Sequence, residues 1–205
     1  MVHGERFNSI SHLVGAGLAV AGAAWLVVMA ARIGDPWRIV SFSIYGAMLV
    51  LLYVFSTLYH SLRGRAKDVL RKLDHCSIYL LIAGSYTPFA LVSLRGGWGW
   101  SLFGVVCALA ILGIVREVWL ARGARVLSLV IYLLMGWLAL VAVVPLWSAL
   151  TPGGFAGLLA GGACYTGGVV FYANDHRLRH GHGVWHLFVL AGSICHFFTV
   201  LLFVV

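Results

Sequence analysis

The chain has 205 residues, of which 62% are apolar and 10% are charged, and its formal net charge is +8. Soluble domains carry roughly a quarter charged residues, so this composition excludes an ordinary soluble protein and predicts an integral membrane protein. In such a protein the excess of lysine and arginine reports orientation and contact with anionic lipid, and it does not indicate binding to nucleic acid. The length leaves room for a single membrane domain over residues 1–205.

Seven apolar runs are long enough to cross a bilayer, which takes about 20 mainly apolar residues. We expect the spans at residues 9–31, 39–60, 74–93, 98–115, 126–147, 153–173 and 184–205. The opening segment MVHGERFNSI lacks the features of a cleaved signal peptide, so the first span is expected to be retained. In the sixth span, Gly157 and Gly161 form a GxxxG pattern that lets two helices approach closely. The predicted fold is all-α, a bundle of seven transmembrane helices.

The loops between these spans divide by charge. One set carries eleven basic residues: Arg6, Arg63, Arg65, Lys67, Arg71, Lys72, Arg116, Arg122, Arg125, Arg177 and Arg179. The opposite set carries three: Arg32, Arg38 and Arg95. Basic loops remain on the cytoplasmic side, so the N-terminus is expected in the cytoplasm and the C-terminus outside.

Four polar side chains lie at or near the cytoplasmic ends of the spans: His60, Asp74, His182 and His186. Ionisable groups in a membrane are costly unless they pair, bind an ion or take part in chemistry, so they mark a functional site by default. Three imidazoles and one carboxylate also match the groups of a zinc site that holds a water molecule. The predicted topology brings all four to one depth.

Each of these residues also has a plainer interpretation. His182 and His186 lie four residues apart on one helix face, which suits a metal pair or two interfacial histidines at a helix start. His60 could end the second span, and Ser56 could orient its imidazole, hold a metal-bound water or bond its own backbone. Asp74 could cap a helix start or accept a proton from zinc-bound water.

The remaining histidines are weaker candidates. His12 is near the start of the first span and could contact the site, whereas His75 points about 100° away from Asp74 around the helix. His196 is roughly 15 Å deeper than His186 and is expected to be buried and hydrogen-bonded. The other acidic residues are expected in or beside loops: Glu5, Asp35, Asp68, Glu117 and Asp175.

These motifs resemble the progestin and adipoQ receptor family and its bacterial branch, the hemolysin III proteins. The resemblance is carried by Glu5-Arg6-Phe7-Asn8 with His12, by Ser56 and His60, by Leu73-Asp74-His75 with residues 82–89, and by residues 182–193 with 196–198. It implies seven helices with a cytoplasmic N-terminus in the bacterial inner (cytoplasmic) membrane. It also implies Zn²⁺ held by His60, His182 and His186, with Asp74 and Ser56 near the bound water.

Three functions are compatible with these residues. The first is a zinc-dependent hydrolase of a lipid amide or ester, linked to membrane-lipid homeostasis, as the resemblance also implies through the related alkaline ceramidases. Here Asp74 would transfer the proton. The second is a receptor or sensor of membrane state with a structural zinc. The third is a pore-forming haemolysin, but a pore needs a polar face through several spans, and the polar groups gather at one end. Membrane lipids are the expected partners, and the oligomeric state is left open.

Overall fold

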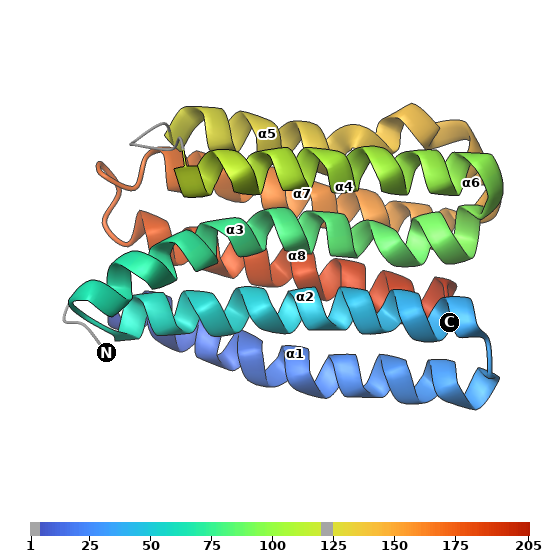
Figure 1. The fold of residues 1–205 in the computed structure, drawn as a ribbon, viewed down its shortest axis with the longest axis horizontal. Helices are drawn as coiled ribbons and strands as arrows, with labels where there is room; N and C mark the ends of the chain where they lie inside the picture. The colour runs from blue at the N-terminus through green and yellow to red at the C-terminus, as the bar shows by residue number, and fades with distance from the viewer. Residues whose placement is uncertain (1–4, 120–124) are drawn as a thin grey trace.

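A computed structural model describes residues 5–119 and 125–205, and within these ranges the chain is helical with no strand. The elements are α1 (Arg6–Ile33), α2 (Pro36–Ser61), α3 (Arg65–Thr87), a π-helical segment η1 (Pro88–Leu94), α4 (Gly96–Trp119), α5 (Arg125–Trp137), a 3-10 segment η2 (Leu138–Ala142), α6 (Val143–Ala149), α7 (Pro152–Ala173) and α8 (Gly181–Phe203). Figure 1 shows them lying side by side along the long axis of the molecule.

Among the described residues, seven helical segments are long and apolar enough to cross a membrane, which confirms the predicted number and order of spans. Helix α3 and η1 form one segment, Arg65–Leu94, and α5, η2 and α6 form another, Arg125–Ala149. The fourth segment, Gly96–Trp119, is longer than expected. The predicted break at 116–125 includes residues 120–124, and these residues, Arg122 among them, lie outside the described ranges.

Local sequence signals account for the helix ends. Gly34 ends α1 with φ of 75°, a backbone conformation that glycine adopts without steric cost. Asp35 then caps α2, because its side chain accepts a hydrogen bond from the backbone N–H of Trp37 at 3.0 Å. Thr151 caps α7 in the same way, with Gly154 N–H as donor at 3.2 Å. The first turn of each of these two helices also contains a proline, which suits a position whose N–H needs no partner.

The third span differs from the sequence prediction at its start. Helix α3 begins at Arg65 and not at Asp74. Arginine, lysine and leucine favour helix, so the charged segment before Asp74 continues the helix beyond the apolar core. Asp74 therefore lies about two and a half turns inside α3, and its interpretation as a helix-start cap is wrong. Glu117 lies in the last turn of α4, beside the predicted break as expected, and it is buried.

Small residues let neighbouring helices approach closely. Helix α8 packs against both α7 and α1, and α2 packs against α1 and α3. On α7, Gly157 faces Thr199 and Gly161 faces His196, so that a Cβ atom at either glycine would collide with the α8 side chain. The close approach predicted from the GxxxG pattern is confirmed.

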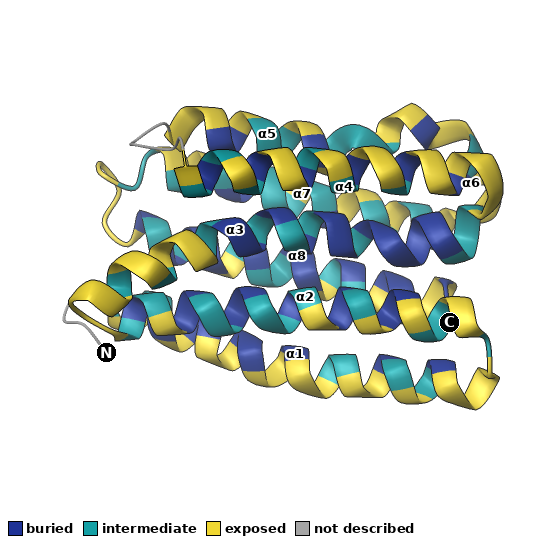
Figure 2. Cartoon of the chain, in the orientation of Figure 1, coloured by how far each residue is buried: buried dark blue, intermediate teal, exposed yellow. Residues whose placement is uncertain are grey.

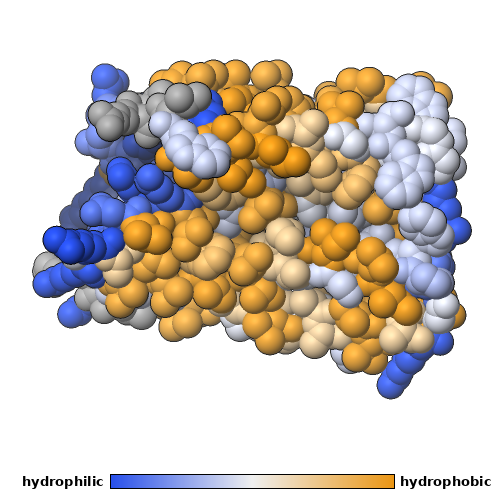
Figure 3. Space-filling model, in the orientation of Figure 1, coloured by the Kyte–Doolittle hydropathy of each residue, from blue (hydrophilic) through white to orange (hydrophobic). Residues whose placement is uncertain are grey.

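The outer surface of the bundle is apolar, as lipid contact requires. Large side chains such as Trp25, Ile111 and Leu134 are more than half exposed, whereas Tyr45 and Tyr53 are fully buried. Figure 2 shows exposed residues along the outward faces of α1 and α4. In Figure 3 an apolar belt covers the middle of the visible face, and the most hydrophilic residues gather at the end where the N-terminus lies. This is the surface of a multi-pass membrane protein.

Candidate metal centre

Three histidines from two distant parts of the chain meet at one end of the bundle. His60 is in the last turn of α2, and His182 and His186 lie in the first turns of α8. Their ring centroids are 4.9–5.1 Å apart. One ring nitrogen from each lies within 4.8 Å of the other two. The shared depth predicted from topology is therefore confirmed for these three residues.

Each of the three imidazoles has a partner at Nδ1. Nδ1 of His60 lies 3.1 Å from a carboxylate oxygen of Glu5, and Nδ1 of His182 lies 3.3 Å from one of Asp175. Nδ1 of His186 lies 3.0 Å from the backbone oxygen of Asn8. An oxygen acceptor of this kind holds the proton on Nδ1 and leaves the lone pair on Nε2.

This arrangement fits a zinc ion. Three neutral imidazoles with their outer nitrogens bonded to carboxylates or carbonyls are a common zinc ligand set. Nε2 of His60 is buried and has no hydrogen-bond partner among the described residues, so a metal would satisfy it. One ring nitrogen from each histidine lies within 4.8 Å of the other two, so the three residues could hold one ion together.

The two carboxylates behind the histidines are held as anions. Partial burial raises the pKa of Glu5, but hydrogen bonds from Lys67 and His60 more than offset this, and its pKa lies below the usual value. Lys67 Nζ lies 2.7 Å from Glu5. Burial likewise raises the pKa of Asp175, and hydrogen bonds from Arg125 and His182 bring its pKa below the usual value. Both carboxylates are therefore ionised at neutral pH and able to accept the Nδ1 protons.

The predicted catalytic residues lie beside the cluster, but their contacts differ from those expected. Asp74 is half-buried, and both Asp74 and Ser56 line an internal cavity. The hydroxyl of Ser56 lies 2.7 Å from Nδ1 of His12. Ser56 thus joins α2 to α1.

The sequence analysis did not predict most of the residues that contact the three clustered histidines. His12 is 3% exposed and stacks on His186, with ring centroids 3.6 Å apart and planes 10° apart. Glu5, Asn8 and His12 all come from the start of the chain. Their spacing of three and four residues places them on one side of the first helix, which is the signal that could have revealed them.

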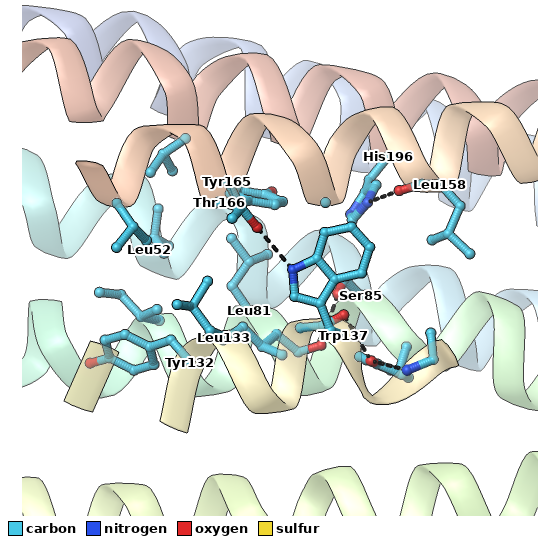
Figure 4. Close-up of a pocket in the computed structure, with 18 of the residues that line it drawn as sticks. Leu52, Leu81, Ser85, Tyr132, Leu133, Trp137, Leu158, Tyr165, Thr166 and His196 are labelled. Atoms are coloured by element: carbon cyan, nitrogen blue, oxygen red, sulfur yellow. Dashed lines mark hydrogen bonds between the residues drawn. The ribbon is translucent and has the colours of Figure 1, made fainter. Parts of the chain in front are cut away.

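An internal cavity of about 150 Å³ runs from the histidines into the bundle. Asp74, His182 and His186 line one end, and His196 lines it roughly 15 Å away along α8. Figure 4 shows its wall, where the Trp137 indole donates a hydrogen bond to Thr166 at 2.9 Å. His196 Nε2 donates to the backbone oxygen of Leu158 at 3.2 Å, which confirms the buried, hydrogen-bonded role predicted for it. Most of the remaining lining is apolar.

The fold and this cluster define the class: a multi-pass membrane protein with a three-histidine candidate metal centre at the end of an internal cavity. Residues 1–197 match the family described as "Haemolysin-III related", and the chain belongs to this family.

Relatives agree with this assignment. The chain is 43% identical to Hemolysin-3 of Bacillus cereus over 201 residues, which cover 98% of this chain and 91% of the relative. It is also 43% identical to the Hemolysin-3 homolog of Bacillus subtilis (strain 168) over 202 residues, covering 98% and 94%. The human monocyte to macrophage differentiation factor, of the progestin and adipoQ receptor family, is 29% identical over 189 residues, covering 89% and 76%. The predicted resemblance is confirmed.

Proposed function

We propose that this protein is a zinc-dependent hydrolase that cleaves an amide or ester bond of a membrane lipid. The observation that carries the proposal is that Asp74, His182 and His186 line the same cavity, whose remaining wall is largely apolar. An acid–base group and a candidate metal-ligand cluster in one largely apolar cavity suit a reaction with an apolar substrate.

The residues take separate roles in this proposal. His60, His182 and His186 would hold zinc through Nε2, which in each ring faces away from the partner at Nδ1. When bound, zinc polarises a carbonyl and lowers the pKa of water towards 7. The carboxylate of Asp74 accepts the proton of the attacking water. The hydroxyl of Ser56, which lines the same cavity, would orient that carboxylate.

The cavity supplies the substrate preference. Leu81, Leu133 and Leu158 are among the side chains that line it. An acyl chain buried there would gain about 0.8 kcal/mol for each methylene removed from water. The polar end of the cavity lies at the end of the bundle where the hydrophilic residues gather, so the bond to be cleaved would lie at headgroup level. We place this end on the cytoplasmic side of a bacterial inner membrane, with a role in membrane-lipid homeostasis.

Hydrolysis by the zinc-loaded protein in detergent tests the proposal. Lipid amides such as ceramide and matched esters are incubated with wild type and Asp74→Asn, and released fatty acid is measured. We expect Asp74→Asn to retain zinc and to lose a factor on the order of 10²–10⁴ in rate, the usual contribution of a general base. A zinc-loaded wild type that is inert on every lipid of the panel would overturn the hydrolase.

A second function, a sensor of membrane state with a structural metal, is favoured by the number of segments that the centre joins. Partners at Nδ1 come from the start of the chain and from the α7–α8 connection, and the ligands come from α2 and α8. A direct bond from Asp74 to zinc would close the site and support this function. The relatives' name "Hemolysin-3" raises a pore as a third function, but the largely apolar cavity lining weighs against an aqueous path.

A further inference from the structure

A second histidine–carboxylate pair lies between α3, α4 and α5. Nδ1 of His75 is 2.8 Å from a carboxylate oxygen of Glu117, whose side chain is 9% exposed. Ser128 donates a hydrogen bond to the other carboxylate oxygen at 3.2 Å. The hydroxyl of Tyr132 donates to the backbone oxygen of His75 at 3.1 Å. Helix α5 therefore contacts both residues of the pair.

This pair is expensive to keep inside a membrane protein. Burial of an ionisable pair in a bundle costs desolvation free energy. The attraction between the two groups offsets this cost only when their geometry is good and further hydrogen bonds are made. Arg116 adds a positive charge beside the pair, because its guanidinium donates a hydrogen bond to Ser128 at 2.9 Å. Apolar side chains such as leucine and valine would fill the same space without this desolvation penalty. The pair therefore indicates a functional role.

The position of His75 indicates which chemistry. Asp74 and His75 both line the cavity, although they are consecutive residues of α3. His75 is held by Glu117 on α4. The His75 side chain retains 30% exposure, and its Nδ1 is occupied by Glu117, so Nε2 is the nitrogen left for a ligand.

We propose that His75 is the second proton-transfer residue of this cavity and that Glu117 positions it, an inference that rests on the proposed hydrolase. The Glu117 carboxylate accepts a hydrogen bond from Nδ1–H and fixes the ring, as the carboxylate of a histidine–aspartate pair does in other hydrolases. The protonated ring then donates its Nε2 proton to the leaving group. Asp74 then needs only to accept the proton of the attacking water.

The proton balance closes over one turnover. A water O–H bond breaks as the new C–O bond forms, and the proton passes to Asp74. The C–N bond of an amide, or the C–O bond of an ester, breaks as the leaving atom takes the proton from Nε2 of His75. Asp74 returns its proton to His75 through cavity water, and the two residues regain their starting charges.

Substrates with different leaving groups test this assignment. An amine needs a proton as it leaves, whereas p-nitrophenolate leaves without one. We therefore compare a long-chain lipid amide with the p-nitrophenyl ester of the same acid, using wild type, His75→Asn, Glu117→Gln and Asp74→Asn, all loaded with zinc. His75→Asn is expected to slow amide hydrolysis on the order of 10²–10⁴-fold and ester hydrolysis less than about tenfold. Glu117→Gln should slow the amide selectively too, and Asp74→Asn should slow both substrates.

The control is His196→Asn, which changes another histidine of the same cavity whose ring bonds to a carbonyl and not to a carboxylate. It should leave the amide-to-ester rate ratio as in wild type. Equal losses on both substrates in His75→Asn, or loss of zinc in that variant, would overturn the assignment of His75 while the hydrolase stands. A zinc-loaded wild type that cleaves neither substrate would overturn the hydrolase, and the role of His75 with it.

Discussion

A carboxylate oxygen of Glu5 lies 3.1 Å from Nδ1 of His60, although the two residues are 55 positions apart. The contact makes the start of the chain part of the candidate metal centre. Lys67 on α3 contacts the same carboxylate, so Glu5 joins three segments at one point. The same short stretch supplies the Asn8 oxygen bonded to His186.

This contact predicts that Glu5→Gln weakens zinc binding. Loss of a carboxylate behind a metal-bound histidine typically costs 10–100-fold in metal affinity. Competition with a chromophoric chelator measures the affinity in detergent. The matched control is Asp68→Asn, because Asp68 is an exposed carboxylate on the same side of the bundle, on α3. Equal affinities for wild type and Glu5→Gln would contradict the prediction.

The three-histidine cluster predicts one zinc ion per chain. His60→Ala, His182→Ala and His186→Ala should each remove most of the metal, because two imidazoles are a poor zinc site. Chelation of wild type should lower its thermal stability, since zinc bound only by the folded state stabilises it. Elemental analysis and a thermal unfolding assay measure these effects. Full zinc content in all three variants is the result that excludes this site.

The charge distribution predicts that the C-terminus is outside the cytoplasm. Helix α8 ends at Phe203, at the end of the bundle opposite the basic loops. Fusions of alkaline phosphatase and of green fluorescent protein after Val205 report the two possible locations. We expect the phosphatase fusion to be active and the fluorescent fusion to be dark. The reverse pattern would place the metal centre on the outer side.

Removing the hydroxyl is expected to affect the free energy of unfolding differently at two buried tyrosines. Tyr86 donates a hydrogen bond to the Met135 oxygen at 2.7 Å and accepts one from Ala139 N–H at 2.9 Å, where the fifth span is interrupted by η2. Tyr86→Phe leaves these backbone groups without their hydrogen-bond partner. It should lower the free energy of unfolding by about 1–3 kcal/mol.

The control is Tyr45→Phe, because the Tyr45 hydroxyl is buried without a hydrogen-bond partner among the described residues. Its removal should leave stability unchanged or raise it slightly, since an unpaired buried hydroxyl is itself a cost. Thermal unfolding in one detergent compares the two variants. A larger loss in Tyr45→Phe than in Tyr86→Phe would show that the hydrogen bonds at η2 carry little stability.

The sequence alone determined the class of fold and the three histidines that meet at one end of the bundle. Membrane spans can be read from sequence because hydrocarbon demands about 20 apolar residues in a row, a local requirement that tolerates few exceptions. The cluster of His60, His182 and His186 could be predicted because span direction alternates, which places the end of one span and the start of another at one depth. That argument uses topology and no side-chain packing.

Only the tertiary structure decided which groups surround the histidines and how the helices deviate from uniform spans. The contacts of Glu5 with His60, of His12 with Ser56 and of His75 with Glu117 each join residues more than 40 positions apart. Tyr86, a residue of another helix, accepts a hydrogen bond from Ala139 at the interruption of the fifth span. Such contacts follow from how rigid helices rotate and cross when they pack, and this rotation is set by side chains of several helices together, so no single segment of sequence encodes it.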